Sequence, residues 1–154
     1  MKIIEPGDIR LIALEITNKN LSAKISPIDQ VIGFDIFEDM SKPTLFATVM
    51  MTDNIGLLDS FPIVGEETVT IEFETPGISG STKYELRCFE VANVNREPNG
   101  KGATYTLRCV SVEHLYNGND LVTKSYKDII SNIVPSLITS YLKTKKPLIV
   151  DETR

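Results

Sequence analysis

The chain has 154 residues, of which 42% are hydrophobic and 24% charged, and its formal net charge is −5 at pH 7. A chain of this length is expected to form one domain, residues 1–154, because it can bury about two-thirds of the surface that its unfolded form exposes. It contains no apolar run of about 18 residues that could span a bilayer, so we expect a soluble protein without a membrane partner.

Acidic and basic residues are unevenly distributed along the chain. Residues 29–90 contain 12 acidic and 3 basic residues, a local charge of −9, whereas residues 91–154 contain 6 acidic and 9 basic residues, a local charge of +3. Two such halves suit contact between neighbouring copies, although a solvated surface of uneven charge explains the same counts. The N-terminal sequence MKIIEPGDIR has acids and a proline where a signal peptide needs an apolar stretch, so we expect an intracellular origin.

Strand-forming residues dominate the first third of the chain. Residues 8–17 predict a strand, and Pro27 restricts residues 21–30 to a sheet edge or a connection. Residues 31–39 and 44–53 predict a hairpin joined by the polar turn Met40-Ser41-Lys42-Pro43. Neither hairpin strand has a fully polar face, which suits a barrel wall or a subunit interface, although burial under a helix would explain it equally well. The apolar segment 54–60 is expected to cap one end of the sheet.

Three further strands are predicted before the sequence pattern changes. Residues 66–75 alternate between apolar and polar side chains, and residues 76–81 form a dense turn signal. Residues 82–94 and 103–115 contain the similar segments YELRCFEV and YTLRCVSV on either side of a polar connection. We interpret these two segments as the strands of a long hairpin.

An amphipathic helix is predicted over residues 125–144. Apolar residues recur every four positions, at Ile129, Ile133, Leu137 and Tyr141. Ser125 with Asp128 resembles a capping box, and Pro135 removes a backbone hydrogen bond, so we expect a kink near this proline. Altogether the sequence predicts a mainly β (α+β) fold, a small antiparallel barrel or sandwich of six to seven strands with a C-terminal helix.

The groups that catalysis needs are sparse. The single histidine, His114, is expected at a strand end, with Ser111 on the opposite face of the same strand, so a catalytic triad finds no local support. Cys88 and Cys109 fall in the two matching strands and are expected to be small buried residues; a disulfide between them is the alternative. One histidine and no close cysteine pair leave a zinc site without ligands.

Other ligand-binding patterns are also missing from the sequence. Adjacent carboxylates, Glu38-Asp39 and Glu66-Glu67, point to opposite faces of a strand and are expected to be solvated edge charges. The glycines do not form a phosphate-binding loop. The sequence therefore predicts a protein that is not an enzyme and has no cofactor. The alternative function is a small barrel that binds a ligand or an oligonucleotide, with Tyr84 and Tyr105 stacking on bases, although the acidic balance disfavours it.

The order of these elements resembles a known family. It comprises a strand, the hairpin IFEDMSKPTLFATVMMTD, a short apolar cap, the strand EETVTIEF, a long hairpin ending in VSVEHLYN, and an amphipathic helix. Over residues 8–142 this order resembles the first tube-like domain of the baseplate hub proteins of contractile-tailed (myovirus-type) bacteriophages. Glu38, Asp53 and Glu66-Glu67 match the acidic strand ends of that family.

The resemblance implies a structural virion protein whose copies form a ring between the tail tube and the central spike. Its partners would be further copies of itself, the tail tube and the spike proteins, in a phage tail baseplate made in the host cytoplasm. DNA would pass through the lumen without specific binding. Family members carry two tube-like domains per chain, whereas 154 residues hold one, so both a trimer and a hexamer remain open. The predicted oligomer interface lies around the first hairpin and consists of Met40, Ser41, Lys42, Pro43, Thr44, Phe46, Met50, Leu57 and Leu58.

Overall fold

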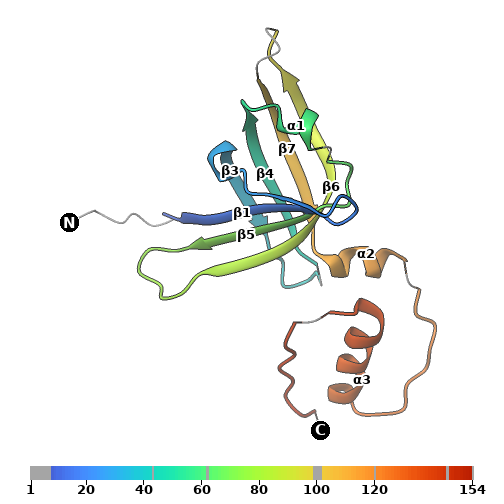
Figure 1. Ribbon diagram of the computed structural model, residues 1–154. Coiled ribbons are helices and arrows are strands. Elements are labelled where there is room, and N and C mark those ends of the chain that lie inside the picture. The colour runs from blue at the N-terminus through green and yellow to red at the C-terminus, as the bar shows by residue number, and fades with distance from the viewer. Residues whose placement is uncertain are drawn as a thin grey trace.

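A computed structural model describes residues 8–42, 44–61, 63–98, 102–119, 121–144 and 146–153. In this part of the chain the strands are β1 (Arg10–Asn18), β2 (Ala23–Ile25), β3 (Val31–Phe37), β4 (Phe46–Asp53), β5 (Thr68–Glu74), β6 (Thr82–Arg96) and β7 (Ala103–Val110). The helical elements are η1 (Ile28–Gln30), α1 (Leu57–Ser60), α2 (Val112–Asn119), α3 (Ile130–Leu137) and the π-helical η2 (Ile138–Leu142). The mainly β fold class predicted from the sequence is confirmed (Figure 1).

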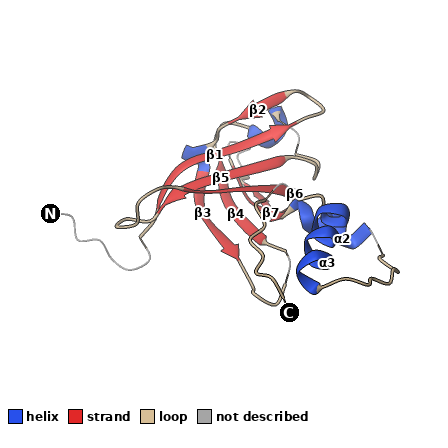
Figure 2. Ribbon diagram, turned by 90° about the horizontal axis from the view of Figure 1, so that it is seen from below, coloured by secondary structure: helices blue, strands red, loops and turns tan. Residues whose placement is uncertain are grey.

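The strands form one curled antiparallel sheet in the order β2-β1-β5-β6-β7-β4-β3. The sheet bends so that β1 and β5 cross over β3 and β4, as Figures 1 and 2 show from two directions. β2 and β3 lie at its two edges, yet the short connection that contains Pro27 and η1 joins them directly. The chain therefore passes from one edge to the other across the open side of a half-barrel.

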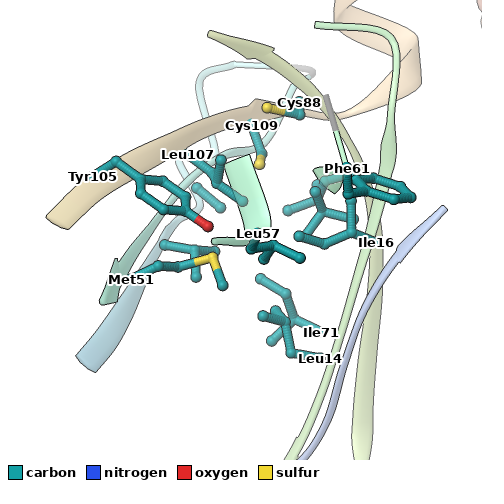
Figure 3. Packing of buried hydrophobic residues seen from close by; sticks show 14 residues of the cluster. Leu14, Ile16, Met51, Leu57, Phe61, Ile71, Cys88, Tyr105, Leu107 and Cys109 are labelled. Carbon is teal, nitrogen blue, oxygen red and sulfur yellow. The ribbon is translucent and has the colours of Figure 1, made fainter. Parts of the chain in front are cut away.

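The concave face of the sheet holds the hydrophobic core. Along β7 the side chains alternate with a period of two, so that Tyr105, Leu107 and Cys109 are buried and Thr104 is exposed. α1 closes one end of the half-barrel by inserting Leu57 into this cluster (Figure 3). The buried cluster consists of Leu14, Ile16, Ala47, Val49, Met51, Leu57, Phe61, Val69, Ile71, Leu86, Cys88, Tyr105, Leu107 and Cys109.

β6 is the strand that lets one sheet fold over itself. Its first half, 82–87, pairs with β5, and residues 87–96 pair with β7. The β6–β7 register shifts between Cys88 and Glu90 and again between Ala92 and Asn95. Each bulge inserts an unpaired residue, which bends the strand and increases its twist. The sheet can therefore change direction along β6.

The prediction of a strand over residues 103–115 is wrong beyond Val110, where β7 ends. Ser111 ends the pairing: its N–H donates to the Leu45 carbonyl oxygen over 3.0 Å, and its hydroxyl accepts from the Leu45 N–H over 3.3 Å. The Ser111 carbonyl oxygen then accepts from the His114 N–H over 3.0 Å, within the first turn after this residue. α2 begins directly after it, so His114 lies on a helix and not at a strand end.

The helix predicted over 125–144 starts later than expected. α3 begins at Ile130, and the Asp128 side chain accepts from the Ile129 N–H over 2.7 Å just before it. Pro135 lies inside α3, and the helix changes to π geometry at Ile138. The kink expected near this proline stays a prediction. No helix in the described part of the chain has both the length and the apolar character required to cross a bilayer.

Candidate assembly surface

The hairpin of β3 and β4 has an inner and an outer face. On the inner face Phe34 lies opposite Val49 and contacts the core, and the outer face pairs Asp35 with Thr48. The Thr48 hydroxyl donates to an Asp35 carboxylate oxygen over 3.2 Å. Among the described strands β3 pairs with β4 alone, so its second edge presents backbone donors and acceptors to solvent.

Residues 39–42 of the hairpin tip form a hydrogen-bonded turn, in which the Lys42 N–H donates to the Asp39 carbonyl oxygen over 3.0 Å. One Asp39 carboxylate oxygen accepts from the Ser41 N–H over 2.9 Å and from the Ser41 hydroxyl over 2.6 Å. These hydrogen bonds hold the pKa of Asp39 below its usual range, with the Ser41 hydroxyl the largest contributor. Met40 lies between Asp39 and Ser41 with a relative exposure of 106%, so the described part of the chain leaves its side chain uncovered.

Apolar side chains continue from the tip onto the outer face of the hairpin. Phe37 and Met50 are exposed, Met50 at 40%. Phe46 is half covered because the ring of His114 meets it edge-on, with the ring centroids 4.9 Å apart. This contact packs α2 against the outer face of β4, so the single histidine has a packing role.

The predicted interface residues divide into surface and interior groups. Met40, Ser41, Lys42 and Met50 are exposed, whereas Phe46 and Leu58 are half-buried. Thr44 is buried, and Leu57 is only 5% exposed within the core. Pro43 lies outside the described residues. As a proposal, the interface therefore centres on the hairpin tip and the outer face of β4.

Sequence reasoning missed a groove on another part of the molecule. It has a volume of about 350 Å³ and lies between the β1–β2 turn and α2. The spacing of Val112, Leu115 and Tyr116 by three and four positions was the available signal, because it is helical and not strand-like. The groove is lined by Lys19, Asn20, Gly65, Glu66, Arg87, Val112, Leu115, Tyr116 and Asn119.

Two buried carboxylates have structural roles. Asp53 accepts from the N–H groups of Leu57 and Leu58 over 2.7 and 3.0 Å and so holds the start of α1. Burial raises the pKa of Asp53, but these and neighbouring amide hydrogen bonds together outweigh burial and keep the pKa below its usual range. Glu67 is fully buried, and its carboxylate accepts four hydrogen bonds, one from the Asn18 side-chain amide and three from the backbone N–H groups of residues 64–66.

The remaining candidate groups are placed as follows. Cys88 and Cys109 are register partners, fully buried and free. Tyr105 points into the core, and burial, aided by the charge of Asp53, raises its pKa, so this ring is not available to stack on a base. The described residues include no group of three His, Cys, Asp or Glu side chains placed to hold a metal ion.

Comparison with known proteins adds a sequence relationship to this geometry. No protein-family model matches the chain. The chain is 24% identical over 132 residues to the protein named probable baseplate hub protein gp334 of Vibrio phage KVP40, and the match covers 84% of this chain and 31% of that protein.

A solved structure of the PdpA–VgrG complex of Francisella has a TM-score of 0.45 and 10% identity to the chain, over 84% of this chain and 22% of the other. The chain spans about a third of the length of the curated baseplate hub protein that it matches. The likeness to phage baseplate hub proteins that the strand pattern predicted is confirmed by that sequence match.

Proposed function

We propose that this chain is a structural, non-catalytic subunit of a phage baseplate hub, and that it assembles into a ring between the tail tube and the central spike. The sequence match to a baseplate hub protein over 84% of the chain supports this role. Tail tube and spike proteins are its proposed partners, and the phage tail baseplate is its proposed location. Three or six copies are both compatible with a domain of this size.

One observation carries the assembly proposal: the β3–β4 hairpin combines a free strand edge with uncovered apolar side chains. Met40 and Met50 are exposed beside an edge that pairs on one side only in the described sheet. Free edges and apolar patches of this kind promote association with another chain. We infer that this hairpin meets a neighbouring subunit.

The outer face of β1 and β5 has a different character. Arg10 and Glu74 form an ion pair of 2.7 Å there, and Lys24 pairs with Glu15 over 2.7 Å. Charged side chains on a strand face discourage association. The same polar face continues onto β6, where the exposed Glu85 lies opposite Thr70 of β5, and this position suits a control substitution.

The acidic balance of residues 29–90 also fits a tube through which DNA passes. The local charge of −9 would repel phosphates and so prevent DNA from adhering to the wall.

Assembly can be tested by size-exclusion chromatography with light scattering. We expect the wild-type chain to form rings, Met50→Lys to prevent ring formation without unfolding the monomer, and Glu85→Lys, on the polar face of β6, to assemble normally. A wild-type chain that stays monomeric at high concentration and does not bind tail components would refute the proposal.

A further inference from the structure

The groove beside α2 has the shape and lining of a receptor for a small apolar side chain. Val112, Leu115 and Tyr116 provide its apolar part, and its volume of about 350 Å³ lies at the lower end of the range for binding pockets. Leu115 is 41% exposed and Val112 is half-buried, so the helix leaves this apolar surface open. An occupant would cover it.

Basic side chains stand beside that apolar surface. Lys19 belongs to the exposed β1–β2 turn, and Arg87 projects from the outer face of β6. The Arg87 guanidinium donates to the Glu66 backbone carbonyl oxygen over 2.7 Å, which uses one of its five donors. The Glu66 carboxylate accepts from the Asn20 side-chain amide over 3.0 Å, so the one acid in the lining already has a partner. The groove therefore suits an apolar group flanked by carboxylates.

The hairpin tip of β3 and β4 has this composition. Met40 is a flexible apolar side chain that the described part of the chain leaves uncovered, and the exposed carboxylates Glu38 and Asp39 precede it directly. Asp39 has a cationic neighbour at 3.7 Å, the exposed Lys42 ammonium, whereas Glu38 has no such contact among the described ion pairs. The hydrogen bonds between Asp39 and Ser41 fix the turn before any contact, so docking would not require the backbone to become ordered.

The tip and the groove are formed by different elements of the protein. The tip follows β3, the strand at one edge, whereas the β1–β2 turn of the groove belongs to the other edge. A contact that joins two different surfaces of the same protein is heterologous, and successive copies related in this way close into a ring when the rotation allows.

We propose that Met40 of one copy inserts into the groove formed by Val112, Leu115 and Tyr116 of the next copy. Glu38 and Asp39 of the first copy then face Lys19 and Arg87 of the second. This inference rests on the proposed ring assembly and names the two surfaces that meet in it.

A mixing experiment tests this arrangement. Met40→Asp replaces the inserting side chain by a charged one but leaves the groove intact. Leu115→Asp places a charge in the groove but leaves the tip intact. We expect each variant alone to have the mass of one chain. Mixed in equal amounts, they should form a complex of two chains and no larger species, because one intact tip and one intact groove remain.

The outcomes separate the two proposals. If the wild-type chain stays monomeric at high concentration and does not bind tail components, both proposals fail. If the wild-type chain forms rings but either variant still assembles, or the mixture gives no two-chain complex, the tip-and-groove contact is wrong and the ring stands. Should Leu115→Asp destabilise α2, as circular dichroism would reveal, Lys19→Glu in the exposed turn serves as the second groove variant and should likewise pair with Met40→Asp.

Discussion

The sheet and the C-terminal segment 121–153 use apolar residues with equal regularity but bury them very differently. In the sheet, Leu107 and Ile16 are completely inaccessible to solvent. In α3 and η2 no residue is buried, although Ile133, Leu137 and Tyr141 recur at helical spacing. Apolar periodicity thus predicts that an element forms, but it does not say what covers that element.

Polar contacts attach the C-terminal segment to the rest of the chain. The Thr144 hydroxyl donates to a Glu113 carboxylate oxygen over 2.7 Å, and Lys146 approaches the same oxygen at 3.3 Å. The Lys143 ammonium lies 5.1 Å from the ring centroid of Tyr116. Contacts of this kind near the surface stabilise weakly, each typically by about 1 kcal/mol or less. The sheet should therefore determine the global stability, whereas the segment should open locally.

The largest expected effect comes from the same truncation made in both regions. Leu107→Ala in the centre of β7 should lower the free energy of unfolding by about 2–5 kcal/mol, because it leaves a cavity among fully buried neighbours. Leu137→Ala in α3, where the side chain is half-exposed, should cost less than about 1 kcal/mol. Urea denaturation followed by circular dichroism measures both. Equal losses would show that the C-terminal segment shares the core of the protein.

A smaller effect is expected from the buried carboxylate at the start of β5. Glu67→Gln retains the shape but replaces one acceptor oxygen by a donor. This donor then faces either the Val64 N–H and the Asn18 amide or the N–H groups of Gly65 and Glu66. The expected loss is about 1–3 kcal/mol, the cost of leaving a buried donor unsatisfied. Glu66→Gln, on the exposed neighbour, is the matched control and should change stability by about 0.5 kcal/mol or less. A similar loss for both variants would contradict the role assigned to Glu67.

The contrast between the two regions also explains what could be predicted from the sequence. β5 and β7 follow from strict alternation, because each has one buried and one outward face. The β3–β4 hairpin follows from two β-prone runs around a polar turn. These signals are local, and the sheet satisfies each of them.

Other features depend on contacts that a linear pattern does not contain. The strand after Ala103 ends because Ser111 bonds to Leu45, a residue 66 positions earlier. The helical spacing of Val112, Leu115 and Tyr116 indicates α2 but not the groove beside it, because Lys19, Arg87 and α2 meet only after the sheet has curled. The predicted interface included Leu57, because an apolar residue can belong either to an interface or to the core. In the structure α1 closes the half-barrel and buries Leu57 in the core.

The smallest expected effect concerns the attachment of the C-terminal segment and its pH dependence. Burial raises the pKa of Glu113, but the Thr144 hydroxyl and the charge of Lys146 outweigh burial and hold the pKa below its usual value. A carboxylate with a lowered folded pKa stabilises above its unfolded pKa of about 4.3, and this contribution is lost as the pH falls through the folded pKa. The attachment should therefore be complete at neutral pH and weaken below about pH 4.

Glu113→Gln should loosen the attachment at neutral pH and remove its pH dependence. Losing one charge-assisted contact costs about 1 kcal/mol, which corresponds to about fivefold faster amide exchange in α3 and η2 with β7 unaffected. Hydrogen exchange with mass spectrometry, corrected for the intrinsic effect of pH, measures this, and Glu85→Gln on β6 is the control. Exchange in the wild-type segment should approach that of Glu113→Gln as the pH falls from 7 to 3, because protonation removes the same charge. If the two proteins exchange equally at pH 7, Glu113 does not hold the segment, and the other contacts between α2 and η2 must do so.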